Sequence, residues 1–338
     1  MTRQIEIPQK PLQRFIELYE AFNEERGWWS DASPLRFSSV IAVTCPGDVN
    51  EIAEVIRSTA SEMGDRMRWF KAISPSLRMI IGAMLVLHGD TPDGFLDEHE
   101  RVQKMFRAVN LRRGGIYEMM AILVLRLSNH LQPITPETID RFQDLYEQMK
   151  RFHWWLIGPD DFPACAALVG QDASAEQIGE EIEAIYQALS ARGMSKGDPL
   201  QTAANLLYLA HRNPELVADQ YAALADGFRA ADVSVWQSDY DELAILSFLD
   251  HTPQHIVDSV LSYRSEMEQL RPKPDRSMTF NLASSIAFLD LVKLDHNLKQ
   301  ITDAKALMDM QAIIAAQQAA AAAAASSAAV AASSASSH

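Results

Sequence analysis

The sequence predicts an all-α protein of about seven helical hairpins, stacked in series as an α-solenoid or closed into an α/α toroid. Three observations predict this fold. Apolar side chains recur three and four residues apart, small residues anchor apolar segments at intervals of about 40 residues, and turn-forming segments separate the helices. Hydrophobic residues make up 48% of the 338 residues, which is enough to build a sizeable core.

The first helix of each predicted hairpin is amphipathic and often carries a tyrosine. Two weaker copies are the segments EIAEVIRSTASEM and RVQKMFRAV. In each copy the apolar positions fall on one helix face, so the other face is expected to meet solvent. The tyrosines of the clearer copies are Tyr19, Tyr146, Tyr186, Tyr221 and Tyr263.

The second helix of each hairpin is more apolar and has a small residue as its anchor. A single hairpin cannot cover such a helix, so neighbouring hairpins must stack on it. The sequence leaves open whether the first and last hairpins meet. The seven anchors are Ala42, Ala83, Ala121, Ala166, Ala203, Ala244 and Ala283.

The turns between the two helices are rich in Gly, Pro, Asp and basic residues, as in RGMSKGDP and RPKPDRS. Aspartates in these turns are expected to accept hydrogen bonds from unpaired amides at the next helix start. The predicted caps are Asp31, Asp161, Asp198, Asp239 and Asp275.

We therefore expect a hairpin array over residues 1–300, a terminal helix over 301–318, and an Ala/Ser-rich tail over 319–338. The tail presents no face to bury, and isolated helices are marginal in water. It is expected to be frayed or disordered.

The segments HWWLIGPDDFPACAAL (153–168) and IYQALSARGMSKGDPLQTAANLLYLA (185–210) resemble an uncharacterised bacterial family. That family is catalogued as domain of unknown function four thousand and three and occurs mainly in Gram-positive spore formers. The similarity extends over most of residues 10–300 and is strongest in the second half. The resemblance implies a helical cytoplasmic protein with no assigned activity, and it supplies no catalytic residue.

Composition argues against several classes of partner. The formal net charge of -15 disfavours nucleic acid, which needs a basic face. No charge-free apolar stretch reaches the roughly 18 residues of a membrane span, so we expect a cytoplasmic protein. Cys45 and Cys165 sit in apolar runs and are expected to be buried free thiols. No metal site or cofactor is expected.

Paired carboxylates precede two of the apolar helices. Facing one cleft, such pairs could act as acid and base or hold a cation, although helix capping explains most residues of this kind. The four candidates are Asp160, Asp161, Asp239 and Asp241.

Basic residues recur in the turns of several hairpins. Stacked helix starts favour anions, so these residues could line an anion-binding edge; alternatively they are ordinary solvated side chains. The candidates are Arg112, Arg113, Lys196, Arg271, Lys273 and Arg276.

Tryptophans precede several second helices. They could wedge neighbouring hairpins together or line a groove as anchors for an apolar or peptide ligand. The candidates are Trp28, Trp29, Trp154, Trp155 and Trp236.

The first functional hypothesis is a scaffold that binds an unidentified protein partner on the concave face of the array. The alternative is an enzyme on an α/α toroid, with turn carboxylates or basic residues gathered in a central cavity. A structural or storage role is a third possibility. The sequence specifies no substrate, no partner and no oligomeric state.

Overall fold

The computed structural model describes residues 6–24, 32–66, 75–111, 114–153 and 158–292. Within these ranges the chain is all-α: fourteen α-helices and two short 3₁₀ turns pack together, and there is no strand. The expected terminal helix over 301–318 and the tail over 319–338 lie outside the described residues.

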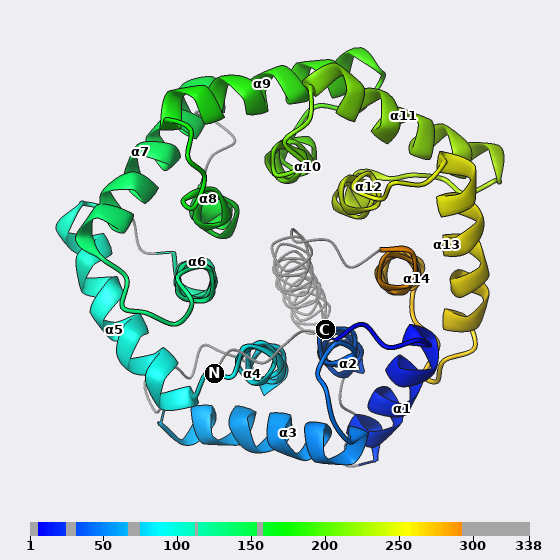
Figure 1. Ribbon diagram of the computed structural model, residues 1–338, viewed down its shortest axis with the longest axis horizontal. Helices are drawn as coiled ribbons and strands as arrows, with labels where there is room; N and C mark the ends of the chain where they lie inside the picture. Colours follow the sequence, from blue (N-terminus) through cyan, green and yellow to red (C-terminus); the bar gives the residue numbers. More distant parts are fainter. Residues whose placement is uncertain (1–5, 25–31, 67–74, 112–113, 154–157, 293–338) are drawn as a thin grey trace, which may run out of the picture.

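The odd-numbered helices form an outer layer that follows the chain around a central axis (Figure 1). Each outer helix buries one stripe of apolar side chains along its length. In the first outer helix, Phe15, Leu18 and Phe22 are at most 2% exposed. The outer helices are α1 (Pro11–Asn23), α3 (Val49–Arg66), α5 (Pro92–Ala108), α7 (Pro136–His153), α9 (Ala175–Ala191), α11 (Pro214–Ala230) and α13 (Pro253–Met267).

The even-numbered helices form an inner layer, seen end-on in Figure 1. Some are buried on every face, as in α6, where each residue from Glu118 to Leu127 is buried. The inner helices are α2 (Ser33–Ala42), α4 (Pro75–His88), α6 (Ile116–Ser128), α8 (Phe162–Leu168), α10 (Asp198–Tyr208), α12 (Tyr240–Leu246) and α14 (Arg276–Leu291).

The predicted anchors all lie in this inner layer. Six of the seven alanines are 0% exposed, and Ala166 is 1% exposed. A small side chain at this point lets the inner helix approach its neighbours closely, which explains why the same residue type recurs.

The first and last hairpins are in contact. Helix α14 packs against both α1 and α2. The Tyr19 hydroxyl donates a hydrogen bond to the carbonyl of Arg271 at 2.9 Å, and the Arg36 guanidinium donates to the carbonyl of Pro272. These contacts join residues more than 230 positions apart in the sequence and bring the two ends of the described array together (Figure 1).

Of the four predicted aspartate caps in the described part of the chain, one caps its α-helix as expected. Asp275 accepts a hydrogen bond from the Met278 N–H and caps α14. The prediction is wrong for Asp198, because Gly197 occupies the cap position of α10 and Asp198 is the first helical residue. Asp31 lies outside the described residues.

Asp161 and Asp239 accept hydrogen bonds at a helix start as predicted, but they cap the 3₁₀ turns that precede α8 and α12 and not the α-helices themselves. A 3₁₀ turn precedes each of their helices, η1 (Pro159–Asp161) before α8 and η2 (Gln237–Asp239) before α12. Each aspartate ends its turn, so its carboxylate accepts from the backbone N–H three residues behind it, Gly158 at 2.9 Å or Trp236 at 2.8 Å.

Candidate functional site

Asp161 and Asp239 occupy the same position in their hairpins, five residues before the anchor alanine. Both are buried and both accept a backbone hydrogen bond within their own turn. Their charged neighbours differ, and this difference determines what each carboxyl can do.

Asp239 is paired with a cation. The Arg276 guanidinium lies 2.9 Å and 3.2 Å from the two carboxylate oxygens. Only 1% of the Asp239 side chain is exposed, so the guanidinium supplies the counter-charge that a buried carboxylate requires. This pair is structural in character.

Asp161 has acidic neighbours instead. The pKa of its carboxyl is raised from 3.8 to about 7, mainly by burial; the hydrogen bond from Gly158 opposes this rise, and the charges of Asp160 and Asp198 add to it. Burial and the Asp160 charge also raise the pKa of Asp198. Asp161 is therefore a buried carboxyl that changes protonation near neutral pH.

The two predicted acidic pairs do not converge. Helix α10 lies between α8 and α12 in the inner layer, so Asp161 and Asp239 belong to non-adjacent inner helices (Figure 1). Asp160 is exposed, and Asp241 accepts a hydrogen bond from the Glu242 N–H at 3.1 Å.

Of the predicted aromatic anchors, Trp236 lies in the described part of the chain and is 57% exposed. The Arg276 guanidinium stacks over its ring at 4.1 Å from the centroid. Such cation–π packing fixes the indole at the surface beside the Asp239 pair. The remaining candidates, Trp28, Trp29, Trp154 and Trp155, lie outside the described residues.

The predicted basic residues do not form a single edge. Arg276 is bound to Asp239, and Arg271 donates from one nitrogen to the carbonyls of Glu268, Gln269 and Leu270 at the end of α13. Lys196 and Lys273 are exposed. Arg112 and Arg113 lie outside the described residues.

Two arginines of outer helices bind backbone carbonyls just after the C-terminal end of an inner helix. Arg14 of α1 donates to the carbonyls of Val43, Cys45 and Gly47, which follow α2. Arg141 of α7 donates to the corresponding residues after α8, namely Val169, Gln171 and Ala173. Each guanidinium thus ties the segment that follows an inner helix to the preceding outer helix.

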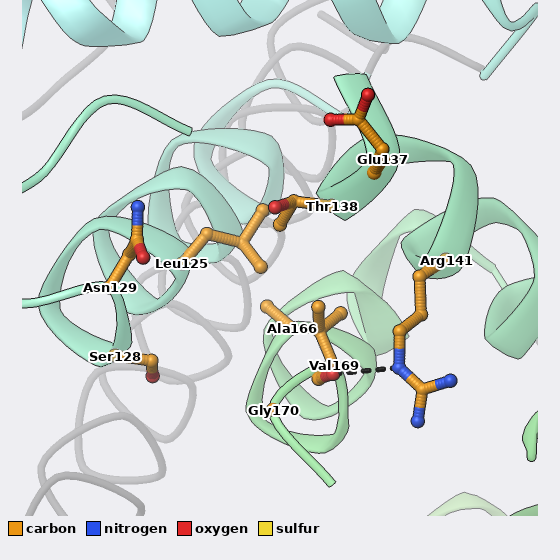
Figure 2. A pocket seen from close by; sticks show the side chains of 9 residues that line it. All are labelled: Leu125, Ser128, Asn129, Glu137, Thr138, Arg141, Ala166, Val169 and Gly170. Atoms are coloured by element: carbon orange, nitrogen blue, oxygen red, sulfur yellow. Dashed lines mark hydrogen bonds between the residues drawn. The ribbon is translucent and has the colours of Figure 1, made fainter. Parts of the chain in front are cut away.

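A pocket of about 320 Å³ opens beside Arg141, between the ends of α6 and α8 and the start of α7. Figure 2 shows Leu125 projecting from α6 toward Thr138, with Ala166 and Val169 on the α8 side. We call it the rim pocket, lined by Leu125, Ser128, Asn129, Glu137, Thr138, Arg141, Ala166, Val169 and Gly170.

The rim pocket combines apolar walls with hydrogen-bond acceptors. Leu125, Ala166 and Val169 supply the apolar surface. Glu137 is exposed, and a hydrogen bond from Thr135 keeps the pKa of its carboxyl below the ordinary value, so it is ionised at neutral pH. Arg141 is the cation of the pocket, and its guanidinium points to backbone carbonyls. Its Nε donates a hydrogen bond of 2.8 Å to the Val169 carbonyl oxygen (Figure 2).

The prediction for the two cysteines is confirmed. Cys45 and Cys165 are buried free thiols, as predicted, and burial raises the pKa of the Cys165 thiol well above its ordinary value. Among the described residues, no group of three or more His, Cys, Asp or Glu side chains could hold a metal ion. No helix in the described ranges is both long and apolar enough to cross a membrane.

Sequence reasoning missed the rim pocket. Its residues come from two hairpins, and Glu137 and Arg141 resemble ordinary solvated charges on an amphipathic helix. The signal available in the sequence was the shared pattern Arg-Phe-x-x-Leu-Tyr-Glu, which begins at Arg14 and again at Arg141.

The chain was compared with known proteins and families. Neither the curated proteins nor the solved structures gave a match. A family model described as "Protein of unknown function (DUF4003)" matches residues 19–319. This match covers most of the described helices and confirms the resemblance seen in the second half of the sequence, so the chain belongs to the DUF4003 family.

Proposed function

We propose that this protein is a cytoplasmic protein-interaction module whose rim pocket receives a lysine or arginine side chain of a partner protein. The observation that carries the proposal is the lining of the pocket, in which an ionised Glu137 stands beside apolar side chains and the local arginine is committed to backbone carbonyls.

Lysine and arginine side chains fit such a lining because their methylene stems pack on apolar surface while the charged head stays at the edge. Leu125, Ala166 and Val169 would contact the stem, and Glu137 would contact the head. The net charge of -15 would attract a basic partner before contact. A volume of about 320 Å³ is sufficient for one long side chain.

For the fold, we propose that the hairpins are copies of one plan and that they close as an α/α toroid. The equivalent carbonyl contacts of Arg14 and Arg141 support a common plan. The packing of α14 on α1 and α2 supports closure. In a closed array no end is left for an open concave groove, so the proposed partner site lies at the rim.

The test is affinity capture from the native cell with matched charge-reversal variants. Glu137→Lys places a cation in the pocket, and Glu176→Lys makes the same change in the first turn of α9, outside the pocket. We expect Glu137→Lys to lose the partner and Glu176→Lys to retain it. Equal recovery by the two variants would contradict the pocket as the partner site.

A second candidate function rests on Asp161. A carboxyl with a pKa of about 7 can exchange protons at neutral pH, as a general acid or base must. The raised pKa of Cys165 argues against a thiolate nucleophile beside it. A screen of ester, amide and phosphoester substrates tests this candidate: activity should follow one ionisation near pH 7 and vanish in Asp161→Asn.

A further inference from the structure

Two histidines lie side by side where α13 begins. His251 stands directly before the cap residue Thr252, and His255 is the third residue of the helix. Their ring centroids are 5.2 Å apart, and the ring planes are inclined by 54°. His255 is exposed and His251 is half-buried. The start of α13 therefore presents two neighbouring imidazoles at the surface of the last hairpin.

A helix start of this kind does not require histidines at these two positions. Helices α5, α9 and α11 are also capped by a side chain that accepts from a backbone N–H in the first turn. The residues before the cap and three residues after it are Asp90 and Gly94 in α5, Ala173 and Gln177 in α9, and Arg212 and Leu216 in α11. The histidine pair is thus a feature of α13 that capping does not explain.

A backbone carbonyl fixes the tautomer of the His251 ring. Its Nε2 lies 3.1 Å from the carbonyl oxygen of Leu291, the last residue of α14. A carbonyl oxygen can only accept, so Nε2 carries the hydrogen, and in the neutral ring Nδ1 carries the lone pair. Histidines that bind metal ions commonly donate their other ring N–H to a backbone carbonyl, which orients the ring for the ion.

The separation of the two rings matches two imidazoles on one metal ion. Zn²⁺ binds an imidazole nitrogen at about 2.0–2.1 Å in tetrahedral geometry, and the ring centre lies about 1.1 Å behind that nitrogen, so two bound rings have centres about 5 Å apart. The observed 5.2 Å agrees with this distance. Because the His255 side chain is exposed, its ring can turn a nitrogen toward the ion without repacking the core.

The pair is suited to a cation and not to an anion. An anion at a helix start is bound by free backbone N–H groups. Here Pro253 has no N–H, and the His255 N–H is donated to the Thr252 hydroxyl. The formal net charge of -15 also attracts cations and repels anions. These features favour a metal ion over a phosphate group.

We propose that His251 and His255 bind one divalent transition-metal ion of the kind that imidazole prefers, such as Zn²⁺, Ni²⁺ or Cu²⁺. His251 donates the lone pair of Nδ1, His255 donates one ring nitrogen, and water completes the coordination. Two protein ligands are fewer than the three of a catalytic zinc site, so binding is weaker than at such a site. The metal site is separate from the rim pocket, none of whose residues belongs to the last hairpin.

The proposal is tested by isothermal titration of the full chain with ZnCl₂ and by NMR of the histidine rings during the same titration. We expect the ring signals of His251 and His255 to shift together at the same Zn²⁺ concentration. Loss of a group that only supports a ligand weakens metal binding by about tenfold or more, so loss of a ligand in His255→Gln should raise the Zn²⁺ dissociation constant by at least that factor.

The matched control is His211→Gln, which removes an exposed histidine whose ring contacts Tyr208 and not a second histidine. This control should keep the Zn²⁺ affinity of the unsubstituted protein. If His255→Gln does not fold, the paired NMR shifts of the unsubstituted protein decide. The proposal is overturned if the two ring signals do not shift together, or if His255→Gln binds Zn²⁺ as tightly as the His211→Gln control.

Discussion

Asp161 and Asp239 show that one position in the hairpin can hold two different electrostatic environments. The local backbone bond is the same in both, but the neighbour is Arg276 for Asp239 and the acids Asp160 and Asp198 for Asp161. A buried carboxyl that has no cation beside it resists ionisation, as at Asp161. The stability of the protein should therefore depend on pH through Asp161.

We predict that Asp161→Asn removes a pH-dependent loss of stability. The pKa of the carboxyl is about 7 when folded, against an ordinary 3.8, so the folded state favours the protonated form. Stability from this group is fully present below about pH 4, falls as the pH rises to about 7, and is constant above. In denaturant titrations the advantage of Asp161→Asn should grow from pH 4 to pH 7. A difference between variant and unsubstituted protein that is the same at every pH would contradict this.

A second prediction concerns the ion pair. Arg276→Gln leaves Asp239 buried without a cation, and breaking a buried pair in this way costs about 3 kcal/mol. Chemical denaturation measures the loss. Lys196→Gln is the matched control, since Lys196 also stands seven residues before its anchor alanine but is exposed. Similar stability losses in the two variants would show that the Arg276–Asp239 pair contributes little.

At the scale of single helices, outer-layer arginines fix the ends of inner helices. Helix α8 has only seven residues, too few to be stable alone, so its position depends on neighbours. Arg141 holds the carbonyls that follow it, and Phe162 at its start packs edge-on against Phe142 and Tyr146 of α7 at 5.4 Å and 5.1 Å between ring centroids.

We predict that Arg141→Ala frees the end of α8. Charge-assisted hydrogen bonds to carbonyls are worth about 1.5–3 kcal/mol, so we expect a stability loss of about 2 kcal/mol. Amide hydrogen exchange should become faster in residues 166–173. Asp144→Ala changes an exposed charge on the same helix and should leave this exchange unchanged; equal acceleration by both variants would contradict the bracing role.

Much of the secondary structure could be predicted because it follows from local periodicity. The spacing of the alanines located the inner helices, and all seven are buried. Details that depend on neighbouring turns could not be predicted. Asp161 precedes an apolar helix like an ordinary cap, but the 3₁₀ turn before α8 directs its carboxylate backward. Its acidic neighbour Asp198 comes from the next hairpin.

The rim pocket and the buried polar contacts were harder to predict than the helices. Gln201 and Asn205 look like isolated polar residues in an apolar helix, and only the structure shows that they are buried and bonded to each other. The rim pocket combines residues from α6, α7 and α8, none of which is unusual alone. Tertiary neighbours, which a single sequence does not report, create both features.

For the whole molecule, the decisive contacts are those between the first and last hairpins. Tyr19 and Arg36 bind the carbonyls of Arg271 and Pro272, and the Arg36 guanidinium lies 5.4 Å from the centre of the Tyr19 ring. The sequence left closure undecided because these partners lie at opposite ends of the array. In the proposed toroid the partner site lies at the rim, and α14 and α2, which are in contact, are neighbours in the inner layer.

The most direct test of this closure is a distance between spin labels on the first and last outer helices, measured by pulsed electron paramagnetic resonance. Glu17→Cys on α1 and Ser262→Cys on α13 place labels at exposed positions, while Cys45 and Cys165 are buried. Ala184→Cys on α9 and Ala223→Cys on α11 give the reference for adjacent outer helices. We predict a single narrow distribution in the range of that reference. A distribution centred far beyond it, or spread over many distances, would contradict a closed array.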